Sequence, residues 1–236
     1  MIASPLAPRA TSQRVYEELH GRIVRGELRP GDALSETRVG VQYGVSRTPV
    51  REVFWRLGEE GLLRVIPQVG TFVAPISIPA VYDAQFVRET LECRAVADAA
   101  GASRPDDVTE LRRLLSRQRQ AIAAADFQHF FALDEQMHRQ LMTLAGHPFV
   151  WQVIAQAKAQ LDRVRFLSLE QDTWPAMILD QHERLIDCVA GHDGAGAAAI
   201  MTAHLRTAFA AIERIAADNP DFFDHPHPAP AGPRGT

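Results

Sequence analysis

Residues 45–57 read V-S-R-T-P-V-R-E-V-F-W-R-L, and the N-terminal part of the chain is organised around them. Its apolar residues recur at the i, i+3, i+4, i+7 spacing of an amphipathic helix, namely Val50, Val53, Phe54 and Leu57. Ser46 is a good N-cap, because its hydroxyl can accept a hydrogen bond from a free amide of the first turn. Arg47, Thr48 and Arg51 lie on the opposite face. A helix over residues 46–60 with two outward arginines suits the DNA major groove, although a solvated surface helix has the same pattern.

The segments on either side of this helix carry further motifs. Residues 26–40 read G-E-L-R-P-G-D-A-L-S-E-T-R-V-G, and residues 61–73 read G-L-L-R-V-I-P-Q-V-G-T-F-V. Together they closely resemble the winged helix-turn-helix of the GntR family of bacterial transcription regulators, over roughly residues 11–75. The resemblance implies a regulator that binds double-stranded operator DNA. One departure is Gly40, where the family usually has alanine, and this glycine weakens the second helix.

The order of elements completes this N-terminal domain, which we assign to residues 1–75. Helices are expected over residues 11–26, near 36–42 and over 46–60, followed by a two-stranded wing at 62–66 and 71–74. The wing glycine, Gly70, would let the backbone approach a phosphate or the minor groove. We expect the DNA contacts to come from these elements, through Thr37, Arg38, Ser46, Arg47, Thr48, Arg51, Gln68 and Gly70.

Composition bounds the rest of the interpretation. The chain has 236 residues, 46% of them hydrophobic, which is enough for two modest domains. Its net charge of −4 divides into +2 for residues 1–75 and −6 for the remainder, and a DNA-binding surface needs only a local basic patch. No apolar run approaches the ~18 residues of a membrane span, and the N-terminus lacks a signal-peptide hydrophobic region. With Cys93 and Cys188 far apart, we expect reduced thiols in a cytoplasmic protein without membrane contact.

The second part of the chain, after the prolines Pro75 and Pro79, has no strand patterns. Helical periodicity and turn signals predict six helices, over residues 77–101, 105–124, 126–145, 148–169, 174–190 and 194–217. The predicted fold class is therefore mainly α: a winged helix-turn-helix followed by an all-α helical bundle over residues 76–217. Residues 218–236 are rich in proline and are expected to form a disordered tail.

Polar residues interrupt the apolar faces of three of these helices. Asp134 and His138 lie one turn apart on the inner stripe of the 126–145 helix. His182 and His204 lie on the inner faces of the last two helices, at heights that differ by less than a turn. One buried histidine is usually just hydrogen-bonded, but a buried carboxylate with three histidines costs energy unless paired or metal-bound. The group predicts a divalent metal site, foremost for Zn²⁺, with Ni²⁺ and Mn²⁺ also suited.

The same residues carry a second resemblance. D-x-x-x-H at 134–138, H-x-x-L at 182–185 and H-L at 204–205 resemble the FCD effector domain of the FadR subfamily, over about residues 77–215. Its metal-binding members carry one aspartate and three histidines, which match Asp134, His138, His182 and His204. His147 is a departure, because the family commonly has asparagine there. The resemblance implies a homodimer with a helical effector pocket for ligands that are often small organic acids.

Arg88 lies on the inner stripe of the 77–101 helix and has two interpretations. It either grips a carboxylate of the effector or forms an internal salt bridge, for instance to Glu92. Arg139 and Arg165 are weaker effector-binding candidates at the pocket rim.

The sequence thus predicts a dimeric regulator, a repressor, whose operator affinity changes when a small carboxylate binds beside the metal. Two alternatives stay open: the metal itself is the signal, or, less favoured, the site is a metal-dependent hydrolase. The hydrolase lacks an inward general base and would leave the DNA-binding module unexplained, so we expect no enzyme.

Overall fold

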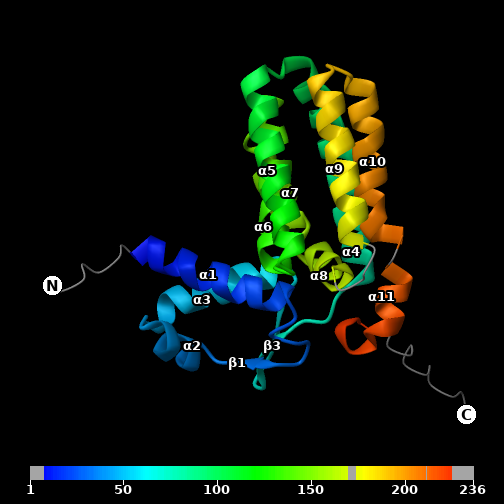
Figure 1. The fold of residues 1–236 in the computed structure, drawn as a ribbon. Coiled ribbons are helices and arrows are strands. Elements are labelled where there is room, and N and C mark those ends of the chain that lie inside the picture. Colours follow the sequence, from blue (N-terminus) through cyan, green and yellow to red (C-terminus); the bar gives the residue numbers. More distant parts are fainter. Residues whose placement is uncertain (1–7, 170–173, 211, 225–236) are drawn as a thin grey trace, which may run out of the picture.

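The computed structural model describes residues 8–169, 174–210 and 212–224. It consists of an N-terminal domain with three helices and a small sheet, and a bundle of long helices that stands on it (Figure 1). The predicted fold class, a winged helix-turn-helix followed by an all-α bundle, is confirmed.

The helix-turn-helix is built from α1 (Pro8–Val24), α2 (Glu36–Tyr43) and α3 (Arg47–Glu59). The predicted apolar face of α3 is buried against α1, in a core that includes Val15, Leu19, Ile23, Val50, Val53, Phe54 and Leu57. Ser46 does occupy the N-cap position of α3, but its side chain makes no capping hydrogen bond, so that part of the prediction is wrong. Gly40 has a packing role, because a Cβ there would lie 2.9 Å from the Val45 carbonyl oxygen. The glycine that weakens α2 therefore lets the turn before α3 come close.

The wing contains one strand more than predicted. β2 (Leu63–Ile66) and β3 (Gly70–Val73) form the expected antiparallel hairpin, with Ile66 opposite Gly70. A third strand, β1 (Ala33–Leu34), pairs with the other edge of β3. Two residues are too few to show an alternating pattern, so sequence periodicity could not reveal this strand.

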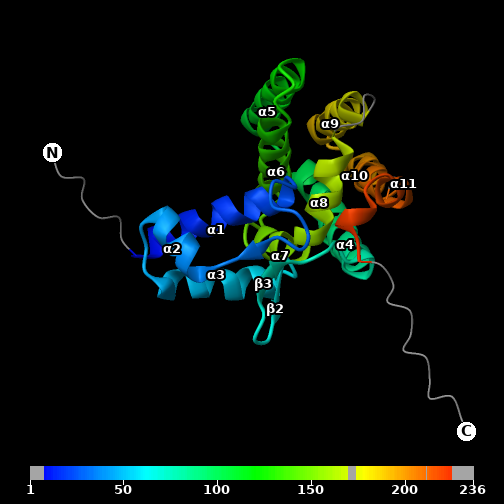
Figure 2. The same cartoon turned by 90° about the horizontal axis from the view of Figure 1, so that it is seen from below.

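The bundle contains α4 (Ile78–Ala102), α5 (Pro105–Ala123), α6 (Phe127–Leu144), α7 (Val150–Ala157), α8 (Ala159–Ser168), α9 (Trp174–Ala190), α10 (Gly194–Ala210) and α11 (Ile212–Asp218). The prediction of one helix over 148–169 is wrong, because the chain turns at Lys158 between α7 and α8. The turn is held by the buried Lys158 ammonium, which pairs with Glu135 at 2.5 Å and with Asp162. The predicted 194–217 helix is described as α10 and α11, on either side of residue 211, which lies outside the described residues. Because the chain turns at Lys158, α8 lies at the base of the bundle, next to the N-terminal domain (Figures 1 and 2).

One described helical stretch, Gly194–Asp218, is long and apolar enough to cross a membrane by length and composition. The core helix of a globular protein satisfies the same test. Here α10 packs against α4 and α9 inside the bundle.

The chain segment directly after α11 is folded, in contrast to the disordered tail that the sequence predicted. Residues 220–222 form a short 3₁₀ helix, and Phe223 is buried. The Ile76 amide donates to the Phe222 carbonyl at 2.7 Å, and the Asp224 amide donates to the Ile76 carbonyl at 3.0 Å. The prediction of disorder is therefore wrong for residues 219–224, which are anchored to the linker between the domains; the remainder of that predicted tail, 225–236, lies outside the described residues.

Candidate metal centre and DNA-binding surface

The structure brings the four candidate metal ligands together in the bundle. α6 provides Asp134 and His138, α9 provides His182, and α10 provides His204. All four are buried, with exposed fractions between 0% and 5%. One ligand atom of each lies within 4.8 Å of the others.

The distances between these atoms match a shared ion. His138 Nε2 lies 3.2 Å from His204 Nε2 and 3.8 Å from Asp134 Oδ1, and His182 Nε2 lies 3.3 Å from the same oxygen. Ligands that bind one ion at ~2.0–2.2 Å stand about 3 to 3.5 Å apart, so the residues fit a divalent metal. His182 Nε2 is buried and, despite its 3.3 Å distance from Asp134 Oδ1, forms no hydrogen bond in the described structure, which is a reason to expect another group at the centre.

The outward nitrogen of each histidine is bonded to a side-chain oxygen. The pairs are His138 Nδ1 with Glu92 at 2.5 Å, His182 Nδ1 with Gln118 at 2.7 Å, and His204 Nδ1 with Gln181 at 3.1 Å. Such an acceptor holds the proton on Nδ1 and leaves the Nε2 lone pair facing the centre. Sequence reasoning named none of these oxygens as supports of the metal site.

The electrostatics favour the metal-binding protonation states. Burial alone would raise the pKa of Asp134, but the positive charge of the neighbouring Arg165 holds it well below its ordinary value. Burial lowers the pKa of His182, and burial together with the neighbouring histidines lowers that of His204 well below its ordinary value. An ionised carboxylate beside neutral imidazoles is the form that ligates a divalent ion.

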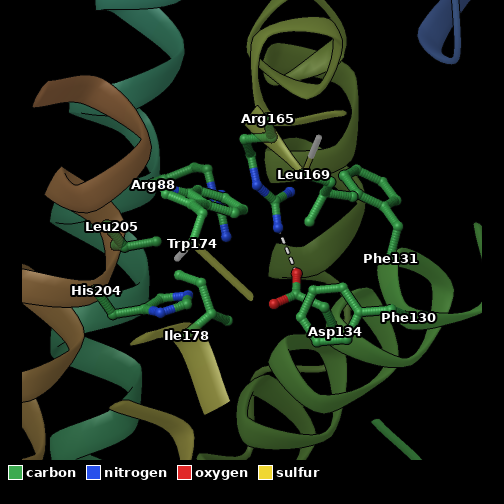
Figure 3. Close-up of a pocket in the computed structure, with 10 residues that line it drawn as sticks. All are labelled: Arg88, Phe130, Phe131, Asp134, Arg165, Leu169, Trp174, Ile178, His204 and Leu205. Carbon is green, nitrogen blue, oxygen red and sulfur yellow. Dashed lines mark hydrogen bonds and ion pairs between the residues drawn. The ribbon is translucent and has the colours of Figure 1, made fainter. Parts of the chain in front are cut away.

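A small cavity adjoins the centre (Figure 3). It is lined by Arg88, Phe130, Phe131, Asp134, Arg165, Leu169, Trp174, Ile178, His204 and Leu205. The centre of a water-sized molecule has about 20 Å³ in which to sit, roughly room for one water. A ligand larger than one water would not fit in the cavity in its present form.

The three candidate effector arginines lie in different surroundings. Arg88 lines the cavity and also forms the internal salt bridge, with Nε 2.6 Å from a Glu92 oxygen. Arg165 lines the cavity and reaches from α8 to the second oxygen of Asp134 (Figure 3). Arg139 does not line this cavity; it borders a groove between the bundle and the N-terminal domain, near Tyr16.

The residues expected to contact DNA are all exposed on α2, α3 and the wing: Thr37, Arg38, Ser46, Arg47, Thr48, Arg51, Gln68 and Gly70. At the wing tip Gln68 has a left-handed backbone, with φ of 61°. The surface also contains an acid that the sequence analysis did not single out. Glu36 of α2 is hydrogen-bonded to both Arg47 and Arg51.

Comparison with known proteins accounts for both domains. Residues 11–73 match the model of the bacterial regulatory proteins of the gntR family, and residues 83–207 match the FCD domain. The chain belongs to the GntR family. It is a DNA-binding transcription regulator with an FCD domain, and such regulators are not enzymes.

Similar proteins support this assignment over almost the whole chain. This GntR regulator is 41% identical to an uncharacterized HTH-type transcriptional regulator in an unstable DNA locus of Streptomyces ambofaciens, covering 91% of this chain and 90% of that protein. It is 35% identical to the HTH-type transcriptional repressor RspR of Escherichia coli K12, over 90% of this chain and 93% of that protein. Its fold is similar to that of E. coli McbR/YncC, with a TM-score of 0.75 at 23% identity, over 86% of this chain and 97% of that chain. The FCD domain of this GntR regulator is of a metal-binding type, with a buried Asp/His cluster that could hold an ion.

Proposed function

We propose that this GntR regulator is a repressor whose operator affinity is set by a small carboxylate bound beside a divalent ion, foremost Zn²⁺. Asp134, His138, His182 and His204 would hold the ion, and Ni²⁺ or Mn²⁺ would suit the same ligands. The observation that carries the proposal is the double role of Asp134. Its Oδ1 faces the histidines, whereas its Oδ2 accepts from Arg165, which belongs to the helix next to the DNA-binding domain.

The route from this carboxylate to the DNA-binding domain runs along α8. Gln160 Nε2 donates to the Gly61 carbonyl at 2.5 Å, and Arg163 Nη1 donates to the Ala74 carbonyl at 2.8 Å. Gly61 precedes β2 and Ala74 follows β3, so both ends of the wing hairpin are bonded to α8. A shift of Arg165 relative to Asp134 would therefore be transmitted to the wing through one short, buried helix.

The contact between α8 and the wing contains an arginine, Arg163, that is incompletely hydrogen-bonded. Arg163 is 1% exposed, and its Nε and Nη2 have no hydrogen-bond partner in the described structure. Burial lowers the pKa of Arg163 to about 10, which reflects the cost of an incompletely paired guanidinium. A second arrangement that pairs these groups would compete with the present one, and a ligand that prefers either arrangement shifts the balance.

The effector would be an anion because of the charges that face the cavity. A divalent ion held by one carboxylate and neutral histidines leaves a net positive centre. Arg88 gives Nε and Nη2 to Glu92, which leaves Nη1 for a ligand. A small acid with two acceptor groups would satisfy both positive points, whereas an apolar ligand would leave them unpaired.

We infer that the regulator works as a homodimer, because a palindromic operator is read by one recognition helix per half-site. The face of α4 and α10 supports a contact with a second copy. Tyr82 and Phe86 are 47% and 74% exposed there, and Tyr82 stacks edge-on with Phe209 at 4.7 Å. Since α4 begins at the interdomain linker, pairing along this face would fix the spacing of two DNA-binding domains. The place of action would be the cytoplasm, which holds the operator DNA.

A second candidate, in which the metal itself is the signal, is favoured by the same bridge. Binding of the ion to Asp134 would change the charge that Arg165 meets, before any acid arrives.

One titration separates the two candidates. The full chain is stripped of metal, reloaded with Zn²⁺, Ni²⁺ or Mn²⁺, and titrated onto an operator selected from random duplex DNA, with and without a panel of two- to six-carbon acids. We expect the acids to change operator affinity only in the reloaded protein. A change on reloading alone supports metal sensing, and identical affinities in all samples contradict both candidates.

A further inference from the structure

The contact between α2 and α3 is unusual for a DNA-reading surface, because it places a carboxylate among the arginines. Glu36 is the first residue of α2, and Arg47 and Arg51 lie in the first turns of α3. The Glu36 side chain is 25% exposed, whereas those of Arg47 and Arg51 are 63% and 67% exposed. The acid is thus fixed at the base of the two arginines, whose ends reach solvent.

The geometry of the Arg51 contact is specific. Arg51 Nε lies 3.2 Å from Glu36 Oε1, and Arg51 Nη2 lies 3.1 Å from Oε2. A guanidinium has five N–H donors. This side-on pairing uses the Nε edge and leaves the Nη1–Nη2 edge, which points along the side chain, free to donate twice more. The free edge is the one that can pair with guanine O6 and N7.

Arg47 is held more loosely by the same carboxylate. Only its Nη2 contacts Glu36, at 3.1 Å from Oε2. One exposed contact is readily exchanged for a DNA phosphate, which accepts from an arginine in any of several orientations. The carboxylate therefore orients Arg51 and does not prevent Arg47 from turning to the backbone.

We propose that Glu36 is a positioning residue that presents Arg51 end-on to a guanine of the operator and so sets base specificity. Two effects combine. The bidentate pairing limits the rotamers of Arg51, so fewer wrong bases and phosphates are reached. The negative charge of Glu36 also repels DNA phosphates, and this cost falls on every sequence, whereas the guanine contact is gained only at the operator. The hydrogen bonds from Arg51 lower the pKa of Glu36, which keeps it ionised at neutral pH.

The proposal rests on the DNA-binding function and is tested with the full chain and a selected operator duplex. Each guanine of the duplex is replaced in turn by 7-deazaguanine, which lacks the N7 acceptor. We expect the wild type to lose affinity at one guanine per half-site, and Arg51→Ala to be insensitive there. Glu36→Ala should lose most of that sensitivity, roughly a tenfold effect, on the scale of one bidentate arginine–guanine contact.

A second readout distinguishes positioning from a structural role of Glu36. Loss of one negative charge near phosphates should raise the affinity for scrambled DNA and steepen the slope of log affinity against log salt by up to about 0.9. Glu59→Ala, at the exposed far end of α3, removes the same charge without touching the arginines and serves as the matched control. It should leave the guanine sensitivity unchanged.

The outcomes are separable. If no duplex can be selected at all, the DNA-binding function itself fails. If Glu36→Ala is as sensitive to 7-deazaguanine as the wild type, the positioning role is wrong. Glu36→Gln replaces Glu36→Ala in this test if the alanine variant does not fold. A wild type that is insensitive at every guanine contradicts the reading of guanine by Arg51.

Discussion

Two carboxylate–arginine pairs in this protein use the same chemistry in opposite surroundings. The side chains of Asp134 and Arg165 are 4% and 7% exposed, and those of Glu36 and Arg51 are 25% and 67% exposed. In the buried pair bulk water cannot reach either charge to replace its partner, so breaking the pair is costly. In the exposed pair water or a DNA group can replace either partner at low cost. The first pair can therefore transmit a change between domains, and the second can exchange partners on DNA.

The largest expected effect comes from breaking the buried pair. Arg165→Met removes the guanidinium that pairs with Asp134, Glu135 and Asp162, and removal of one partner from a buried ion pair typically costs ~3–5 kcal/mol of folding free energy. Urea denaturation of the metal-free chain measures it. Arg112→Met, which breaks an exposed pair with Asp187, is the control and should change little. Equal small losses in both variants would contradict the distinction between the two surroundings.

Removal of the exposed arginine should act on DNA and not on the fold. Arg51→Ala, and similarly Arg47→Ala, should weaken binding to the selected operator roughly 5- to 150-fold while the urea midpoint stays near that of wild type. Fluorescence anisotropy with a labelled duplex measures the binding. Unchanged operator affinity in both variants would mean that α3 is not the recognition helix.

The next prediction concerns Arg88, which belongs to a buried ion pair and also lines the cavity. Arg88→Ala should abolish the acid response, which in coupled systems is about 5- to 150-fold in DNA affinity. It should also lower the free energy of unfolding, because the buried Glu92 loses its guanidinium partner, but the folded protein should keep its metal content and unliganded operator binding. The response is read from operator titrations at increasing acid concentration. A variant that still responds at the wild-type acid concentration would leave Arg88 with its salt bridge to Glu92 alone.

A partial loss of metal binding is expected from a change one layer away from the ion. Gln118→Ala removes the acceptor behind His182 Nδ1 and should lower metal affinity by about 10- to 100-fold without abolishing binding. Competition with a chromophoric chelator measures the affinity. A variant with wild-type affinity would show that the orientation of His182 is fixed by packing and not by Gln118.

The sequence revealed the features that depend on neighbours within one helix. The i, i+3, i+4, i+7 spacing was sufficient to orient α3 and to place Asp134 and His138 on the same inner face. His182 and His204 followed from the antiparallel arrangement of α9 and α10. These predictions needed only the geometry of a regular helix and of one short turn.

The features that were missed depend on partners far away in the chain. At the turn between α7 and α8, the Lys158 ammonium group pairs with Glu135 of another helix. Residues 219–224 are anchored by backbone hydrogen bonds between Ile76 and Phe222 and between Ile76 and Asp224. The oxygen of Gln118 acquires its role only when α5 packs against α9. None of these contacts leaves a periodic pattern in the local sequence.

Metal analysis of the purified full chain shows whether the Asp/His cluster holds an ion, which it must do for the carboxylate of Asp134 to connect the ion with α8. We expect close to one divalent ion per chain in the wild type, none in His182→Ala or His204→Ala, and a wild-type value in His129→Ala, whose exposed histidine lies on α6 outside the cluster. Stoichiometry near zero in the wild type after reloading with Zn²⁺, Ni²⁺ and Mn²⁺, or undiminished in both cluster variants, would contradict the account.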